Sequence, residues 1–282
     1  MDQLATPVPV GTRLRLAHGV LELIAQDADA PVLHVKGVAL HEELAAGRRR
    51  STDCDVLVRP DRVDALCAAL EAAQWRRLTH FAHGSVFMHA ATFHHDVWGT
   101  VDVHRSFPGL DRDPAATFTR FWAERTSISL GGVECAVPSL EHQRLLLLVH
   151  AARDHQGRAP HDVEVAWTHL GTAEQAGLDS LSEELGARVP VALVTGRPEL
   201  ARGGRQEHLW TALHEGQDAR GIRMAMLRDV TSPHDVALLL REVARVNPDH
   251  LALRLGRPPT RRELRREWWA RWPRWLLPAR RP

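Results

Sequence analysis

Residues 48–60 read RRRSTDCDVLVRP, and the segment CDVLV inside this stretch decides the fold. Its aliphatic and β-branched residues, closed by a proline, predict a short buried strand. Side chains alternate along a strand, so Cys54 and Val56 point into the core. Asp53 and Asp55 then share the opposite face. Two carboxylates held this close repel each other unless a cation lies between them, an arrangement that oxygen-binding divalent metals such as Mg²⁺ use.

The segment TVDVHRSF at residues 100–107 repeats this device on a second predicted strand. Valines flank Asp102, so Asp102 and His104 point away from the core. Three carboxylates on adjacent strands can hold two metal ions about 3.5 to 4 Å apart, the geometry that activates an attacking oxygen in phosphoryl-type transfer. We therefore predict Asp53, Asp55 and Asp102 as catalytic residues and metal ligands.

A glycine turn precedes these strands. The segment PVLHVKG at 31–37 predicts a strand that ends on this turn and leads into a helix over 38–46. The backbone amides of Gly37 and Val38 would then lie at a helix N-terminus, where phosphate oxygens bind. Lys36 is the only lysine of the chain, because every other basic residue apart from histidine is arginine. A single ammonium group beside this turn indicates a specific role.

Four phrases occur along the chain in the order LHVKGVAL, RRRSTDCDVLVRP, GTVDVHRSFPG and LLLLVHAARDHQG. Together they resemble the family called uncharacterised nucleotidyltransferases, which is common in bacteria and related to DNA polymerase beta. The resemblance covers residues 15–170. It implies an α+β fold, in which a nucleotidyltransferase-like mixed sheet with helices is followed by a mainly helical C-terminal half. It also implies Mg²⁺ or Mn²⁺ as the cofactor and an NTP as a substrate.

The resemblance also assigns roles to individual residues. Asp53 and Asp55 match the paired metal-binding acids, and Asp102 matches the third acid, which helps to deprotonate the acceptor hydroxyl. The nucleotide contacts that it implies are Lys36, Gly37, Val38, Arg49 and Ser51. The residues that it implies in support of the site are His104, His150, His155 and Asp162. Two neighbours, Arg48 and Arg50, could serve in place of Arg49. Val38 departs from the superfamily pattern, which has a serine or a second glycine there to contact the triphosphate.

The remaining sequence predicts how the chain is organised. The expected helices cover 14–26, 61–73 with Asp61 as its cap, and the apolar segment after Ser139. The expected strands over 85–93 and 100–107 pair with each other and extend the sheet of the preceding strands. A hairpin is expected over 127–137, with its turn at Gly131 and Gly132. Helices dominate from Pro138 onward. We expect a nucleotidyltransferase-like domain over 1–137, a helical domain over 138–256 and a basic tail over 257–282.

Composition sets the class of protein. A chain of 282 residues with 44% hydrophobic and 25% charged residues has the composition of a folded globular protein and excludes wholesale disorder. Its three cysteines, Cys54, Cys67 and Cys135, share no CxxC spacing and lie in apolar segments, which favours a reducing compartment. The longest apolar run, residues 145–149, is far shorter than the roughly 20 residues that span a bilayer. We expect a cytoplasmic protein with no transmembrane segment.

The tail over 257–282 has an unusual composition. It holds nine arginines against two glutamates, a net charge of +7, which leaves −6 for the rest of the chain. Thr260 and Glu263 form a capping-box pattern, so we expect a helix to begin there and to end at Pro273. Four of the nine tryptophans also lie in the tail. This composition suits contact with RNA, with a peptide or with an anionic membrane surface, and equally a helix that packs back on the protein.

These observations lead to one functional prediction and two alternatives. We expect a metal-dependent enzyme that moves an NMP from an NTP to a hydroxyl or phosphate of a small molecule or modified peptide. The alternatives are transfer to RNA such as tRNA, and a noncatalytic protein that keeps the fold for binding or as a scaffold. Eighteen histidines raise the question of zinc, but His150 and His155 are five residues apart and would face different sides of a helix.

Overall fold

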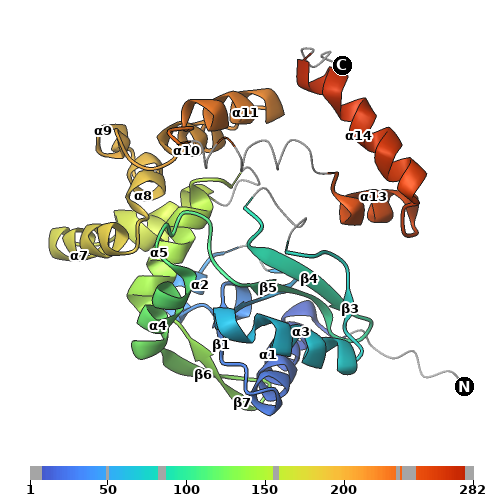
Figure 1. Ribbon diagram of the computed structural model, residues 1–282. Helices are drawn as coiled ribbons and strands as arrows, with labels where there is room; N and C mark the ends of the chain where they lie inside the picture. Colours follow the sequence, from blue (N-terminus) through green and yellow to red (C-terminus); the bar gives the residue numbers. More distant parts are fainter. Residues whose placement is uncertain are drawn as a thin grey trace, which may run out of the picture.

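A mixed sheet forms the centre of the protein, whose computed structural model describes residues 8–48, 51–81, 87–154, 159–232, 236 and 246–276 (Figure 1). The strands, in their order across the five-stranded sheet, are β1 (Val32–Val35), β2 (Cys54–Val58), β5 (Gly99–His104), β4 (Ala90–His95) and β3 (Arg76–Arg77). β2 and β5 are parallel, and the other neighbouring pairs are antiparallel. The sheet is therefore of the mixed kind that we predicted.

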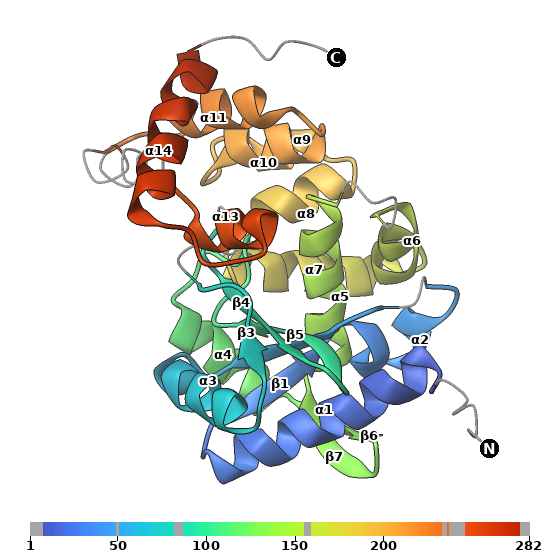
Figure 2. The same cartoon turned by 90° about the vertical axis from the view of Figure 1, so that its right-hand side faces the viewer.

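One face of the sheet, the α1 face, is covered by α1 (Val10–Asp27) and α3 (Val63–Ala72) (Figure 2). Leu14 and Leu21 of α1 belong to the same apolar cluster as Cys54 and Val56 of β2. The alternation read from the sequence is therefore confirmed for β2. Burial of these side chains contributes roughly 25 cal/mol for each Å² of apolar surface removed from water.

The opposite face, the α5 face, packs against α5 (Leu140–Ala151) and α4 (Pro114–Ala123). Leu33 and Leu57 of the sheet share an apolar cluster with the leucines of α5. Ser139 caps α5 as predicted, because its Oγ accepts a hydrogen bond from the backbone N–H of His142 at 3.4 Å. A helix that is apolar on nearly all sides must be buried, and α5 lies between the sheet and the helices that follow.

A hairpin of β6 (Thr126–Leu130) and β7 (Val133–Val137) forms a second, two-stranded sheet beside α1 and β1. Its turn is Gly131 and Gly132, with φ of 63° and 83°, as the two glycines predict. The hairpin, which is the last β structure along the chain, therefore lies next to the first helix, α1, and the first strand, β1.

Helices make up the rest of the described chain: α6 (Ala159–Val163), which continues into a π-helical turn (Glu164–Thr168), α7 (Thr172–Glu184), α8 (Arg188–Val194), α9 (Pro198–Ala201), α10 (Glu207–His214), α11 (Ala219–Arg228), α13 (Pro248–Leu255) and α14 (Arg261–Leu276). The C-terminal half is thus mainly helical, as predicted. Figures 1 and 2 place α11 and α14 at the end of the molecule away from α1. None of the described helices combines the length and the apolar composition needed to cross a membrane.

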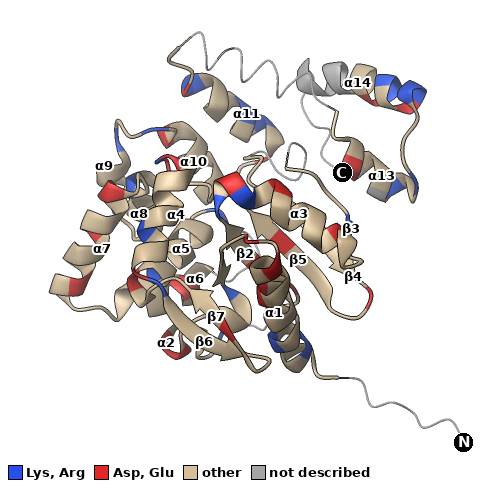
Figure 3. Ribbon diagram, turned by 60° about the horizontal axis from the view of Figure 1, so that its bottom comes forward, with Lys and Arg blue, Asp and Glu red and all other residues tan. Residues whose placement is uncertain are grey.

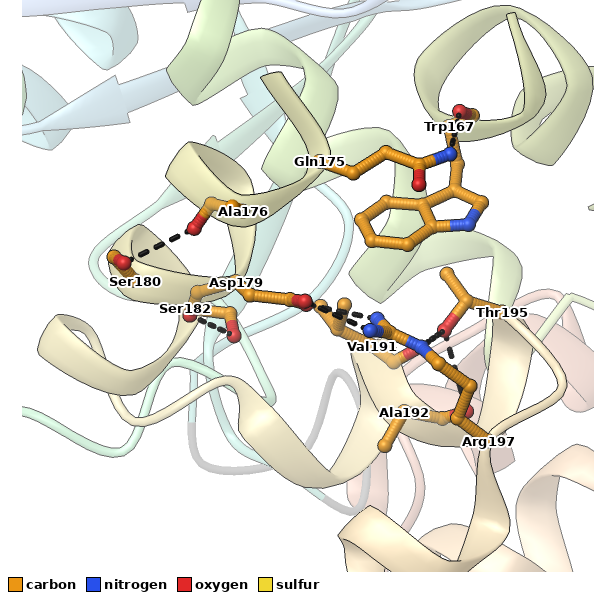
Figure 4. Close-up of polar contacts among 10 residues, drawn as sticks. All are labelled: Trp167, Gln175, Ala176, Asp179, Ser180, Ser182, Val191, Ala192, Thr195 and Arg197. Atoms are coloured by element: carbon orange, nitrogen blue, oxygen red, sulfur yellow. Dashed lines mark hydrogen bonds and ion pairs between the residues drawn. The ribbon is translucent and has the colours of Figure 1, made fainter. Parts of the chain in front are cut away.

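An arginine between α8 and α9 connects helices of this half (Figure 4). Arg197 Nη1 and Nη2 donate to the two carboxylate oxygens of Asp179 on α7, at 2.7 and 2.8 Å. The same guanidinium lies 4.3 Å from the ring centroid of Trp167. The planar guanidinium donates to both carboxylate oxygens through its fork of N–H groups while its face lies on the ring, a geometry that a lysine ammonium lacks.

Three helix predictions need correction. Asp61 does not cap α3; it lies in a 3-10 turn (Pro60–Arg62) and its carboxylate accepts from Arg59 Nε at 2.8 Å. The expected helix over 38–46 is divided into a 3-10 turn (Gly37–Ala39) and α2 (Glu42–Ala45), because Leu40 is extended between them.

The third correction concerns the tail, where the capping box of Thr260 and Glu263 forms as predicted. α14 nevertheless continues through Pro273 to Leu276. A proline inside a helix removes one backbone hydrogen bond and bends the chain, and a helix that is already several turns long can continue past it.

The strand expected over 85–93 is also displaced along the chain. Phe87 to His89 are not in a strand, and β4 runs from Ala90 to His95, two residues beyond the expected end. The first part of the expected strand, residues 85–86, lies outside the described residues. The antiparallel pairing of Ala90 to His95 with β5 extends the strand into what the sequence indicates as a turn.

Candidate active site

The acidic residues of the central strands lie side by side because β2 and β5 are parallel and in register. Asp55 is paired with Asp102, and Leu57 is paired with His104. Paired residues point to the same face of a sheet, so these polar side chains converge on the α5 face. One ligand atom from each of Asp55, Asp102 and His104 lies within 4.8 Å of the other two. The three side chains are close enough to act on one ion.

The carboxylate of Asp55 has two hydrogen-bond partners, Lys36 and His104. Lys36 Nζ donates to its Oδ1 at 3.0 Å, and His104 Nε2 lies 2.7 Å from the same oxygen. Burial alone would raise the pKa of this carboxyl, which is only 7% exposed. The charge of Lys36 and the contact with His104 outweigh burial and hold the pKa of Asp55 well below its usual range. Asp55 is therefore a permanent anion at neutral pH.

Asp102 has the opposite electrostatic character. Burial and repulsion by Asp55 raise its pKa, against the opposing effects of His104 and of a hydrogen bond from Thr92. Thr92 Oγ1 donates that bond to Asp102 Oδ1 at 2.7 Å. Neighbouring carboxylates whose environments push their pKa values apart are typical of acid and base sites.

Asp53 lies immediately before β2 and is oriented by Ser51. The Ser51 hydroxyl lies 2.8 Å from the carboxylate of Asp53 and 3.0 Å from its carbonyl oxygen. All three predicted acids line one pocket of about 370 Å³ on the α5 face, which we call the acidic pocket. The residues predicted for the nucleotide that also line it are Lys36, Gly37 and Ser51, and those predicted in support are His104 and His150.

The glycine turn is tightly built. Gly37 has a φ of 50°, and a Cβ added there would lie 3.1 Å from Cβ of Ser51. Lys36 is itself left-handed, with φ 59° and ψ −171°, a conformation that a residue with a side chain adopts only under strain. Val38, predicted to contact the nucleotide, lines a neighbouring pocket of about 550 Å³ and not the acidic pocket.

Arg48, named above as an alternative to Arg49, lines the pocket and is paired with the predicted acid Asp162. Arg48 Nε and Nη2 donate to the two oxygens of Asp162 at 2.7 and 2.9 Å. Burial would lower the pKa of Arg48, but the bonds and charge of Asp162 raise it above its ordinary value. Asp162 thus fixes a cation that lines the pocket. The predicted residues Arg49 and His155 lie outside the described residues.

The pocket also contains residues that were not predicted, among them Arg153 and His89. Arg153, after the end of α5, is a half-buried cation whose pKa is lowered by desolvation, against the opposing charges of Asp55 and Asp154. His89 lies with its ring centroid 5.4 Å from that of His104, and burial followed by repulsion from His104 lowers its pKa to about 2. The signal for Arg153 was present, since it follows His150 in the phrase LLLLVHAARDHQG. No comparable pattern marks His89, which precedes a strand that begins later than expected.

The donors of the pocket suit a hard divalent cation. Asp55, Asp102 and Asp53 offer carboxylate oxygens, the ligands that Mg²⁺ and Mn²⁺ prefer. A cation between Asp55 and Asp102 would relieve the repulsion that raises the pKa of Asp102. His150 has its pKa lowered to about 3 by burial and by the charges of Lys36 and Arg153, so it adds no positive charge near neutral pH.

The solved structures that resemble this chain include an antibiotic-resistance factor and an antibiotic adenylyltransferase. One is the antibiotic-resistance factor ANT(2'')-Ia, with a TM-score of 0.42 and 15% identity over 62% of this chain and 94% of that one. The other is the lincosamide antibiotic adenylyltransferase LnuA in its lincomycin-bound form, with a TM-score of 0.36 and 16% identity over 52% of this chain and 91% of that one. No curated protein sequence matches the chain.

Comparison with family models is decisive for identity. The model described as uncharacterised nucleotidyltransferase matches residues 14–199, more than half of the chain. This range contains the glycine turn, all three acids of the pocket, and the cations Lys36, Arg48 and Arg153 that surround them. The chain belongs to the family of uncharacterised nucleotidyltransferases.

Proposed function

We propose that this protein transfers a nucleoside monophosphate from an NTP to a hydroxyl group of a small molecule, with Mg²⁺ or Mn²⁺ as its cofactor and release of pyrophosphate. The observation that carries the proposal is the in-register pairing of Asp55 with Asp102, with Lys36 on Asp55 and Thr92 on Asp102. This pairing gives one permanently charged carboxylate and one whose pKa is raised, side by side in a pocket.

The residues divide the work by charge. Asp55 and Asp102 would hold the divalent cation, and Asp53, oriented by Ser51, would complete its ligands. When bound, the cation neutralises charge on the transferring phosphate and polarises it. Lys36, Arg48 and Arg153 line the same pocket and would bind the triphosphate. Such positioning and electrostatic stabilisation provide most of the catalysis in phosphoryl-type transfer.

The reaction forms a bond from the acceptor oxygen to the α-phosphorus and breaks the bond from that phosphorus to the oxygen bridging to the β-phosphate. Pyrophosphate leaves with that oxygen. Asp102 would take the proton of the acceptor hydroxyl, because Asp55 is already bound by Lys36 and His104, whereas Asp102 accepts from the neutral hydroxyl of Thr92. Asp55, held as an anion by Lys36, cannot serve this purpose as well.

A second pocket supports a small acceptor. It has a volume of about 360 Å³, shares His89 with the acidic pocket, and is lined by Phe107 and, from the helical half, by Arg205 and Gln206. Phe107 stacks on His104 with the ring centroids 4.9 Å apart. The two pockets therefore adjoin at His89, whose ring lies beside that of His104, the partner of Asp55. A volume of this order is typical of sites for small molecules.

The test is calorimetric titration of Mn²⁺ together with each NTP into three proteins. We expect the wild type to bind at least one NTP, and the Asp55→Asn/Asp102→Asn double variant to bind it at least a hundredfold more weakly. The control, Asp96→Asn, changes a carboxylate that is 94% exposed and should bind as the wild type does. Equal affinity in all three proteins would contradict the proposal. Binding without transfer of label from the α-phosphate to any acceptor would favour the noncatalytic alternative.

A second candidate, transfer to RNA, is favoured by the arginines of α14, which appear in blue along its ribbon (Figure 3). Its exposed arginines, Arg261, Arg262, Arg265 and Arg266, have no ion pair among the residues that the structure describes. Phosphate backbones bind such groups in a salt-dependent way. Replacing all four with glutamine should then abolish RNA binding in a filter assay and leave Mn²⁺·NTP affinity unchanged. RNA binding that survives these changes would remove the candidate.

A further inference from the structure

A second polar cluster lies on the α1 face, on the side of the sheet opposite the acidic pocket. It is made by Glu22 of α1, His34 of β1 and Cys135 of β7. His34 and Cys135 are fully buried, and the Glu22 side chain is 12% exposed. His34 is paired with Val56, which faces α1, and not with Asp55, so the sheet separates this cluster from the predicted catalytic acids.

The cluster has the dimensions of a metal site. One ligand atom from each of the three side chains lies within 4.8 Å of the other two, and His34 Nε2 is 2.9 Å from Glu22 Oε2. The donors are one sulfur, one imidazole nitrogen and one carboxylate oxygen. Zn²⁺ accepts this combination at four-coordinate centres with bond lengths of about 2.0 to 2.3 Å. A sulfur donor disfavours Mg²⁺, which prefers oxygen ligands only.

Each ligand also has a partner that orients it. His34 Nδ1 is 2.7 Å from Nδ1 of His18, which lies on the same helix as Glu22. If His34 donates its Nδ1–H to His18, its Nε2 lone pair is directed at the cluster. Gln26 Nε2 donates to the other oxygen of Glu22 at 2.9 Å, which leaves Oε2 toward His34. Metal-binding histidines and carboxylates are commonly fixed by contacts of this kind.

The surrounding backbone is built for close approach at this point. A Cβ on Gly19 would lie 2.7 Å from the carbonyl oxygen of Leu130, and a Cβ on Gly131 would lie 2.9 Å from Cα of Leu16. Two glycines, one on the helix and one on the hairpin, thus let α1 and the β6–β7 hairpin meet almost backbone to backbone. This contact brings Cys135 within reach of the helix residue Glu22.

We propose that Glu22, His34 and Cys135 form a zinc site that fastens α1 and the hairpin to the edge strand β1, with a water molecule as the fourth ligand on the partly exposed side of Glu22. Binding converts the Cys135 thiol, which now donates to the carbonyl oxygen of His18 at 3.8 Å, into a thiolate and releases its proton to solvent. The site is independent of the proposed nucleotide transfer.

Cobalt distinguishes this site from the acidic pocket, because a thiolate bound to Co²⁺ gives a charge-transfer absorption that carboxylates do not. The experiment titrates Co²⁺ into reduced, metal-free protein and follows this absorption. We expect saturation at one equivalent in the wild type and in Cys67→Ala, a matched control at a buried cysteine of α3. Cys135→Ala should lose the absorption completely. Zn²⁺ should displace Co²⁺ and raise the Tm of the wild type but not of Cys135→Ala.

A second variant guards against a misfolded cysteine variant. Glu22→Gln keeps the shape of the side chain and a hydrogen-bonding oxygen, and we expect it to fold, as judged by circular dichroism, and to bind Co²⁺ at least tenfold more weakly. No absorption in the folded wild type at excess Co²⁺ would overturn the proposal. The three side chains would then form a hydrogen-bonded cluster that binds no metal ion. Absorption that survives Cys135→Ala, or full affinity in folded Glu22→Gln, would overturn it as well.

Discussion

The two faces of the central sheet carry polar groups in very different surroundings. On the α5 face, Asp55 and Asp102 line an open pocket and take their properties from charge, with Lys36 3.0 Å from Asp55. On the α1 face, His34 lies in a closed layer where glycines allow the backbones of helix and hairpin to touch. We expect substitutions on the first face to change chemistry more than stability, and substitutions on the second to do the reverse.

Lys36 shows how the two faces are separated. His34 and Lys36 are two residues apart and would share a face if β1 continued. The strand ends at Val35, and the left-handed backbone at Lys36 turns its ammonium to Asp55 on the other face. Strain of this kind costs roughly 1 to 3 kcal/mol and is concentrated at functional sites. The fold therefore tolerates strain on the face where a charge is needed.

The largest effect is expected for Asp55→Asn. The change removes a metal-binding charge and leaves Lys36 half-buried without its anion, so the rate of nucleotidyl transfer should fall about a thousandfold or more. Steady-state kinetics with the best NTP and acceptor, with circular dichroism to establish folding, measures this. Asp96→Asn, at an exposed site, should keep the wild-type rate. A folded Asp55→Asn protein of near wild-type activity would remove Asp55 from the site.

The next effect separates strain from chemistry. Lys36→Gly places the residue that best tolerates a φ of 59° at this position, but it removes the ammonium. We expect the transfer rate to fall about a hundredfold. The free energy of unfolding should change little, because relief of backbone strain offsets much of the stability lost with the ion pair. Gln74→Gly is the control, because exposed Gln74 is also left-handed, with a φ of 65°. It should keep full activity and gain up to about 1 kcal/mol of stability.

The third prediction concerns the α1 face. Gly19→Ala forces a Cβ to within 2.7 Å of the carbonyl oxygen of Leu130, so α1 and the hairpin must move apart. We expect a loss of about 2 kcal/mol in the free energy of unfolding, within the range for overpacked interiors, and normal transfer rates below the melting temperature. Gly11→Ala lies on the same helix with no atom within 4 Å of the new Cβ. It should be neutral or gain up to about 1 kcal/mol. Urea titrations of both variants decide this.

Local patterns in the sequence were sufficient for the elements that position the acids. Alternation around Cys54 and Val56 predicted β2 with its buried face, and two glycines predicted the hairpin turn. Asp61 failed as a helix cap, because a preceding proline starts a 3-10 turn and Arg59 takes its carboxylate. Patterns of this kind indicate the conformation that a short segment prefers by itself. A competing contact with a nearby side chain, such as that of Arg59 with Asp61, can override this preference.

The unpredicted parts of the site depend on contacts between distant segments. Thr92 reaches Asp102 only because β4 pairs with β5 in one particular register. Arg48 meets Asp162 across 114 residues of chain. The parallel pairing that sets Asp55 beside Asp102 joins strands separated by a helix and another strand pair. The sequence indicated that three acids would face one way. Only the tertiary structure shows that Asp55 and Asp102 approach each other closely, whereas Asp53 accepts a hydrogen bond from Ser51.

The smallest effect tests how the sheet tunes Asp102. The hydrogen bond from Thr92 favours the charged form of this carboxyl, so Thr92→Val should raise its pKa further. Because metal binding requires the carboxylate, Mn²⁺ affinity should fail at a higher pH than in the wild type as the solution is acidified, and full affinity should return in alkaline solution. A bond worth about 1 kcal/mol shifts the midpoint by somewhat under one pH unit. Titration of Mn²⁺ at a series of pH values measures this midpoint.

Two control variants accompany Thr92→Val. Thr92→Ser keeps a hydroxyl and should have the wild-type midpoint. Thr100 lies on β5 two residues from Asp102, and its hydroxyl is 3.4 Å from His94 Nδ1, so Thr100→Val should also leave the midpoint unchanged. A midpoint that is the same in Thr92→Val and Thr100→Val would mean that the pKa of Asp102 is set by burial and by Asp55, without the neighbouring strand.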